Sequence, residues 1–199
     1  MTCLSIRMFF KRLSAWWYRA VTTLRLLVAV AVFALFMVMV LPNMTERLTD
    51  LTGVNVSPDT ALVYAAKDLY AMAEAYGAAG RAYYIYSRFT FDLAWPAVYL
   101  LFLASLITRL FRFLDPNDPR RLVNLLPFIA VIFDLLENSA ASLVMFRYPL
   151  ASPLAASLAP VFTFLKWVFI GFSFIALIIG LSLFLRNYLK KLIKLDIKG

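Results

Sequence analysis

Four long apolar stretches constrain the fold of this sequence more than any other feature. A helix needs about 20 mostly apolar residues to cross the roughly 30 Å hydrocarbon core of a bilayer. The chain has 199 residues, of which 63% are hydrophobic and 16% are charged, so we do not expect water to be its main solvent. We therefore predict an all-α membrane protein, a four-helix transmembrane bundle in one domain covering residues 1–199. The spans are expected at Thr23–Leu41, Phe89–Thr108, Leu122–Phe146 and Leu158–Leu185.

Basic residues predict the orientation, because cytoplasmic flanks of membrane spans are enriched in Lys and Arg. They gather in residues 1–25, in the turn-rich loop at 109–121 and in the tail at 186–199. These three regions share one side only if the chain crosses four times. We therefore expect both termini in the cytoplasm, in a prokaryotic inner or cell membrane. A signal peptide is not favoured, because no small-x-small cleavage site follows the first apolar run.

The connection at 42–88 is then expected outside. Its segment Ser57-Pro58-Asp59 is typical of a helix start, with an N-cap, a proline and an acid in the first turn. Apolar residues then recur at helical spacing, and Gly77 and Gly80 offer a stop. The pattern predicts an external amphipathic helix at about 58–76, which lies on the membrane surface or caps the bundle.

Tyrosines are concentrated just before the second span. Amphipathic rings favour the membrane–water boundary, so we interpret them as an aromatic belt in preference to a stacking site for a ligand. The tyrosines closest to the span are Tyr83, Tyr84 and Tyr86.

Composition argues against several kinds of site. There is no histidine, and Cys3 is the single cysteine, so the commonest metal ligands and general bases are missing and no internal disulfide can form. We expect no metal and no cofactor. The net charge of +9 lies where apolar stretches end, which favours anionic lipid headgroups over nucleic acid as the partner.

Ionisable residues inside the third and fourth spans are the strongest functional signal. Asp134, Glu137 and Asn138 share one helical face, because they are spaced three and four residues apart. Lys166 is a lone cation in the fourth span. At about 1.5 Å of rise per residue, Glu137 and Lys166 lie on the order of 12–14 Å from the external ends of their helices. We predict that they form an ion pair, with Asp134 one turn deeper.

Two interpretations of these residues remain open. One is a neutralised ion pair that fixes helix packing. The other is a binding site, because Asp92, Asp134 and Glu137 outnumber Lys166, and the surplus acid calls for a proton or a cation. In the second interpretation Asn138 joins the site, and Arg81, Tyr84 and Arg88 line its external mouth.

Three functions follow, in decreasing order of support. The first is an integral membrane protein that binds or conducts a small polar or cationic species, or a lipid headgroup, at this acidic site. The second is an accessory or assembly subunit of a larger membrane complex. The third, an intramembrane lipid-modifying enzyme, is disfavoured because the two aspartates lie at different depths and a serine nucleophile has no histidine base.

Residues from Ser57 to about Gly180 also resemble a group of small four-span integral membrane proteins of bacteria and archaea, to which no activity is assigned. The resemblance implies a four-span fold and a shared polar constellation, and nothing about a substrate. It is carried by Tyr76-Gly77-Ala78-Ala79-Gly80-Arg81, Asp92, Trp95-Pro96, Tyr99, Leu126-Pro127, Asp134, Glu137, Asn138, Tyr148-Pro149 and Lys166-Trp167.

Overall fold

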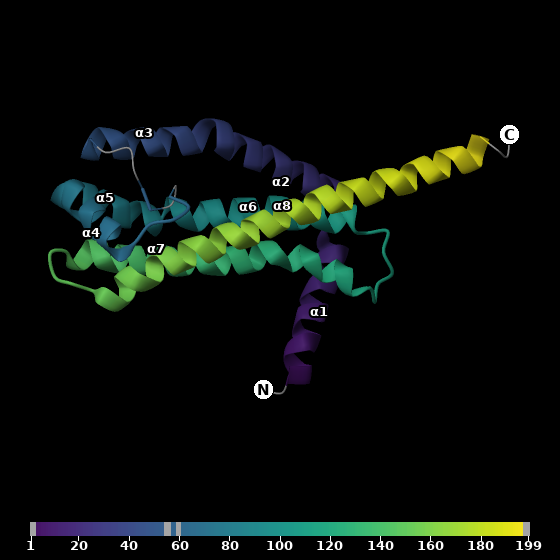
Figure 1. The fold of residues 1–199 in the computed structure, drawn as a ribbon. Helices are drawn as coiled ribbons and strands as arrows, with labels where there is room; N and C mark the ends of the chain where they lie inside the picture. Colours follow the sequence, from purple (N-terminus) through teal and green to yellow (C-terminus); the bar gives the residue numbers. More distant parts are fainter. Residues whose placement is uncertain (1–2, 54–56, 59–60, 197–199) are drawn as a thin grey trace.

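The computed structural model describes residues 3–53, 57–58 and 61–196, and throughout these ranges the regular structure is helical. The long helices run side by side along one axis (Figure 1). Four helical segments are long and apolar enough to cross a membrane, which confirms the all-α fold with four candidate spans. These segments are Thr23–Thr52, Gly77–Leu110, Pro119–Arg147 and Pro153–Lys190.

The first span is longer than predicted. Helix α2 (Thr23–Leu35) continues through a π-helical segment (Phe36–Val40) into α3 (Leu41–Thr52), so the expected end at Leu41 is wrong. Pro42 does not stop the helix, because it lies in the first turn of α3, directly after the wide π turns that accommodate its missing N–H. The Asn43 side-chain amide donates to the Met39 carbonyl inside this segment.

The helix predicted between the first two spans is shorter than expected and begins later. It is α4 (Ala66–Ala75), and residues 61–65 before it are not helical, so the helix start expected at Ser57–Asp59 is wrong. Asp59 itself lies outside the described residues. The helix begins instead where the Asp68 carboxylate accepts the Ala65 backbone N–H at 2.8 Å.

A further helix, α5 (Gly77–Arg88), leads from α4 towards the second span, α6 (Phe91–Leu110). Gly77 has a φ of +60°, which ends α4 as expected. Gly80 is not a stop, because it lies within α5. It faces α3, and a Cβ added there would come within 2.6 Å of Thr52 Cγ2.

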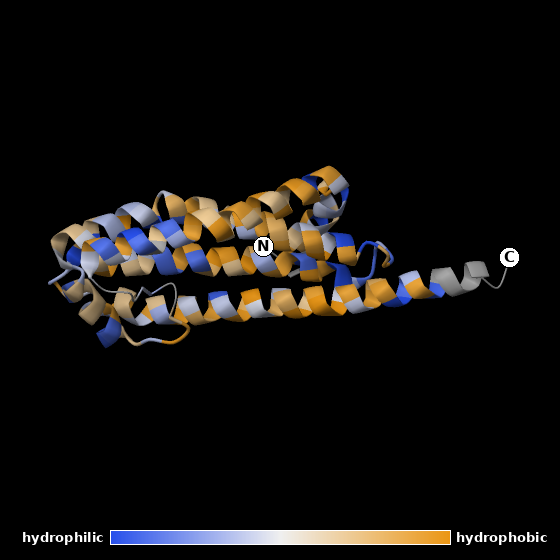
Figure 2. Cartoon of the chain, turned by 90° about the horizontal axis from the view of Figure 1, so that it is seen from above, coloured by the Kyte–Doolittle hydropathy of each residue, from blue (hydrophilic) through white to orange (hydrophobic). Residues whose placement is uncertain are grey.

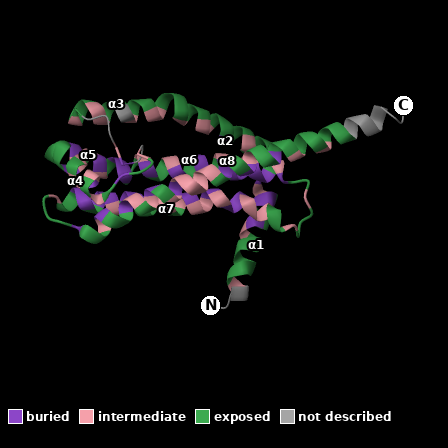
Figure 3. Cartoon of the chain, viewed as in Figure 1, coloured by how far each residue is buried: buried purple, intermediate pink, exposed green. Residues whose placement is uncertain are grey.

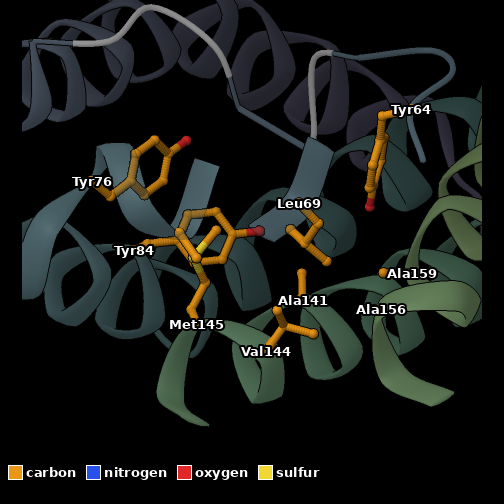
Figure 4. Close-up of a cluster of buried hydrophobic side chains, with 10 residues drawn as sticks. Tyr64, Leu69, Tyr76, Tyr84, Ala141, Val144, Met145, Ala156 and Ala159 are labelled. Atoms are coloured by element: carbon orange, nitrogen blue, oxygen red, sulfur yellow. The ribbon is translucent and has the colours of Figure 1, made fainter. Parts of the chain in front are cut away.

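Several tyrosines expected in a surface belt belong to a core instead. Tyr64, Tyr76 and Tyr84 are buried in a cluster that joins the α4–α5 region to α7 and α8 (Figure 4). Tyr84 points between α5 and α7, and its side chain is fully buried. The belt interpretation is therefore wrong for these three residues, while Tyr86 is 66% exposed and is compatible with it.

The third and fourth spans are α7 (Leu126–Arg147), preceded by a 3₁₀ turn (Pro119–Leu125), and α8 (Pro153–Asp196). These two helices share the most extensive packing in the molecule. Helix α8 begins five residues before the predicted Leu158 and continues through most of the predicted tail. Its last turns run beyond the bundle (Figure 1).

The outward faces of the spans are apolar. Figure 2 shows a long hydrophobic stretch in the middle of α8, and Figure 3 shows α2 and α3 largely exposed, whereas α6 and α7 are mostly buried or half-buried. Val38 and Ile178 are 73% and 66% exposed. In water such surfaces would be costly, and in a bilayer they face acyl chains.

The N-terminal flank, which the sequence analysis used only to predict orientation, forms a helix, α1 (Cys3–Ala20). It crosses the end of the bundle where the basic residues gather, rather than running along it (Figure 1). The Ser14 hydroxyl donates to Asn124 Oδ1 at 2.9 Å, and Asn124 Nδ2 donates to Thr108 Oγ1 at 3.2 Å. Arg112 donates to the carbonyls of Tyr18 and Val21 at 2.6 and 2.7 Å, which caps the C-terminal end of α1.

Candidate functional site

The candidate site lies where α7 faces α8. Lys166 Nζ lies 2.5 Å from Glu137 Oε2 and 3.6 Å from Asp134 Oδ1, so the predicted Lys166–Glu137 ion pair is present and Asp134 joins it. The two acids are one helical turn apart on α7, and Lys166 reaches them both from the antiparallel neighbour. The side chain of Glu137 is fully buried, and those of Lys166 and Asp134 are at most 9% exposed. A single ammonium group is therefore the charge partner of two carboxyls.

Helix α6 supplies a third contact that the sequence-based list of site residues missed. The Tyr99 hydroxyl donates to Asp134 Oδ2 at 2.9 Å, and Tyr99 is itself buried. Asp134 thus has one oxygen towards Lys166 and the other towards Tyr99. A usable signal existed, because Tyr99 follows Asp92 by seven residues, or two helical turns, and so lies on the same face of α6. The spacing alone does not say that this face meets α7.

Asp92 forms a separate ion pair with Arg88 across the junction between α5 and α6. Arg88 Nε lies 2.9 Å from Asp92 Oδ2, and both side chains are at most 10% exposed. The Arg88 guanidinium also lies over the ring of Tyr84, 4.5 Å from its centroid. Arg88 and Tyr84 are therefore buried beside Asp92, where sequence reasoning had placed them at an open mouth.

Arg81 is engaged elsewhere. Its guanidinium donates to the Ala73 carbonyl at 2.8 Å, near the C-terminal end of α4, and lies over the Tyr148 ring at 4.9 Å. Seven residues separate it from Arg88 on α5, which is a rise of about 10 Å. Its contacts hold α4 and the α7–α8 loop to α5.

Two polar side chains on α7 extend the site towards the end that carries α4 and α5. Asn138 and Ser142 are 3% and 4% exposed. Within the described part of the chain, neither the Asn138 amide nor the Ser142 hydroxyl has a hydrogen-bond partner. Buried polar groups without a protein partner are commonly hydrated by internal water. Ser142 lies about 7.5 Å beyond Glu137 along the helix, so polar atoms continue outwards from the ion pair.

The buried charges of the described residues do not balance. The buried side chains that carry a formal charge are two cations, Arg88 and Lys166, and three acids, Asp92, Asp134 and Glu137. Full ionisation would give these five buried side chains a formal net charge of −1. Such a charge is costly in a low-dielectric interior, because no water reorganises around it.

The arrangement does not resemble a transition-metal centre. Among the residues described here, no three His, Cys, Asp or Glu side chains are grouped closely enough to hold a metal ion. Its donors are carboxyl, amide and hydroxyl groups beside an ammonium group, which suits a proton or another small cation better than a soft metal.

No family model, curated protein or solved structure matches this chain. The resemblance to small four-span membrane proteins therefore stays a prediction. The function is inferred from the buried polar residues of the candidate site.

Proposed function

We propose that this chain is an integral membrane protein that takes up and releases one proton at the Asp134–Glu137–Lys166 cluster. The observation that carries the proposal is the imbalance in the bundle core, where two carboxyls lie within 3.6 Å of one ammonium group while Asp92 is neutralised by Arg88. A single proton would cancel the formal net charge of the buried side chains without requiring space for a ligand.

The surrounding groups support proton exchange. Tyr99 hydrogen-bonds Asp134 on the α6 side, so the acid pair is held by groups from α6 and α8. Asn138 and Ser142 provide buried polar atoms between the acid pair and the end of the bundle that carries α4 and α5. Water bound to them would connect the acids to that surface. Uptake of the proton changes the charge at the α7–α8 contact, which is how protonation would alter helix packing.

The proposal is tested by infrared difference spectroscopy of the purified protein during a pH titration. The expected result is one carbonyl band of a protonated carboxylic acid that appears and disappears as the pH is changed. Asp134→Asn or Glu137→Gln abolishes the pH-dependent band. Asp118→Asn, which changes a carboxyl in the loop after α6, leaves the band intact.

A second variant tests whether the acid that gives the band is the one that Tyr99 contacts. Tyr99→Phe removes the hydrogen bond to Asp134 and should move the pH midpoint of the band. Tyr86→Phe changes an exposed tyrosine by the same single oxygen and should not. A spectrum without a pH-dependent buried acid, or a band unchanged by both acid variants, would overturn the proposal and leave the cluster a structural ion pair.

A further inference from the structure

A groove of about 480 Å³ lies in the angle between α1, α2 and α6, away from the acid pair. Its volume falls within the roughly 300–1,000 Å³ of small-molecule sites. The walls are almost entirely apolar, with Arg25 and Ser105 as polar exceptions. The side chains that shape it are Trp16, Trp17, Leu24, Val28, Val98 and Leu101.

The groove runs along most of α2. Its lining extends on this helix from Leu24 to Val32, so it covers more than 10 Å at about 1.5 Å per residue. One leaflet of the hydrocarbon core is about 15 Å thick, half of roughly 30 Å. The groove therefore covers most of the thickness of one leaflet. That leaflet is the one next to the basic end of the bundle, where α2 begins.

Arg25 lies at the shallow end of the groove. Its Nη1 donates to the Ala20 carbonyl at 2.5 Å, and its backbone N–H donates to the N-cap hydroxyl of Thr22 at 3.2 Å. These bonds hold Arg25 at the bend between α1 and α2. A guanidinium has five N–H donors, so the bond to Ala20 leaves others for an anionic group.

Helix α1 contributes an aromatic ring to this end of the groove and carries further positive charge along its length. Trp16 is 52% exposed, as is typical of a ring at the boundary between headgroups and acyl chains. The basic residues of α1 are Arg7, Lys11, Arg12 and Arg19. An apolar groove that begins among cations complements an amphiphile with an anionic head and a hydrocarbon chain.

We infer that the groove between α1, α2 and α6 binds one acyl chain of an anionic phospholipid, with the lipid phosphate at Arg25. A bilayer supplies this ligand at high local concentration. The lipid phosphate binds the cation at the shallow end of the groove, and the acyl chain packs against the apolar walls below it. This inference is independent of the proposed proton site.

The test measures retention of dioleoylphosphatidylglycerol and dioleoylphosphatidylcholine by the detergent-purified chain, using native mass spectrometry. The wild type should retain one phosphatidylglycerol in preference to phosphatidylcholine. Arg25→Gln should weaken this binding about tenfold, as expected for loss of a charge-assisted hydrogen bond. Arg186→Gln removes the same charge from an exposed position on α8 and should leave the binding unchanged.

A variant that fills the groove distinguishes an acyl chain bound there from a lipid held by surface charge alone. Val28→Phe places a ring among the lining residues and should abolish retention. Val30→Phe, on the same helix but outside the lining, should not. Equal retention of both lipids, or equal effects of the two phenylalanine variants, would overturn the inference. So would a dimer that Val28→Phe dissociates, because the groove would then hold a second protein chain.

Discussion

At the scale of single residues, Lys166 is a buried cation beside two buried acids. It is 4% exposed and is the charge partner of both Glu137 and Asp134. Buried ion pairs add little net stability, but removal of one member is strongly destabilising, because the remaining charge has neither water nor a counter-charge. Helix packing around α7 and α8 therefore depends on this side chain, whichever role the cluster has.

Lys166→Met should lower the free energy of unfolding by about 3–5 kcal/mol, because it leaves two buried carboxyls without their cation. Thermal unfolding in mild detergent measures the loss. The double variant Lys166→Met/Glu137→Gln should recover most of it, since only Asp134 then stays ionisable beside Tyr99. If the double variant is as unstable as the single one, the methionine itself disrupts packing and the charge argument is wrong.

At the scale of helices, hydropathy predicts the spans because each must present an apolar surface over a fixed length. Depth counting also predicts the Lys166–Glu137 pair, because rise per residue is constant along antiparallel helices. The local start signal before α4 fails, although Gly77 ends this helix as predicted. The Ser57-Pro58-Asp59 pattern competes with tertiary contacts, among them the hydrogen bond between the hydroxyls of Tyr64 and Thr163 at 3.1 Å, which no local pattern reveals.

The docking of helix α1 could not be predicted for a related reason. The basic residues of the first 20 positions were interpreted only as a topology signal, which obscured that Ser14 and Tyr18 lie on one face of a helix. The partners of these two side chains, Asn124 and the carbonyl of Arg121, are about a hundred residues away. Contacts over such separations depend on how whole helices dock, and a single sequence does not contain that information in its periodicity.

The close approach of α8 to α6 depends on Gly180. A Cβ at this position would lie 2.6 Å from Phe111 Cε2 and 3.0 Å from Leu110 Cβ. Gly180→Ala should therefore destabilise the bundle by about 1–3 kcal/mol, as overpacking does. Gly171→Ala is the matched control on the same helix, because nothing lies within 4 Å of its added Cβ. It should be neutral or stabilising by up to about 1 kcal/mol. Equal melting temperatures for the two variants would contradict this packing role.

The docking of α1 depends on Asn124, which is fully buried and bonds both Ser14 and Thr108. Asn124→Ala should cost about 1–3 kcal/mol, because it removes the hydrogen bond to the buried Thr108 hydroxyl and the shorter of the two that Ser14 makes. Hydrogen exchange should accelerate across α1 while α7 beyond its first turn keeps its protection. Asn117→Ala, in the exposed loop nearby, should leave exchange in α1 unchanged. Faster exchange throughout the bundle would show that Asn124 supports the global fold rather than this one helix.

For the whole molecule, the two ends of the bundle differ in charge. Helix α1, the loop between α6 and α7 and the last turns of α8 lie at one end, and the α7–α8 loop and α4 lie at the other (Figure 1). Basic residues at the first end include Arg112, Arg120 and Arg186. The Arg120 guanidinium donates to Asp118 there and lowers the pKa of that carboxyl, so Asp118 stays ionised at neutral pH.

The basic end should face the cytoplasm, because Lys and Arg next to spans are retained on that side. With Cys3 replaced by Ser, single cysteines at Asn117, Leu150 and Tyr188 report sidedness, since all three positions are exposed. A membrane-impermeant maleimide should label Leu150→Cys in intact cells, and should label Asn117→Cys and Tyr188→Cys only after permeabilisation. Labelling of Asn117→Cys and Leu150→Cys from the same side would contradict the third span. The opposite pattern at all three positions would keep four spans and reverse the orientation, which would also move the proposed lipid groove to the outer leaflet.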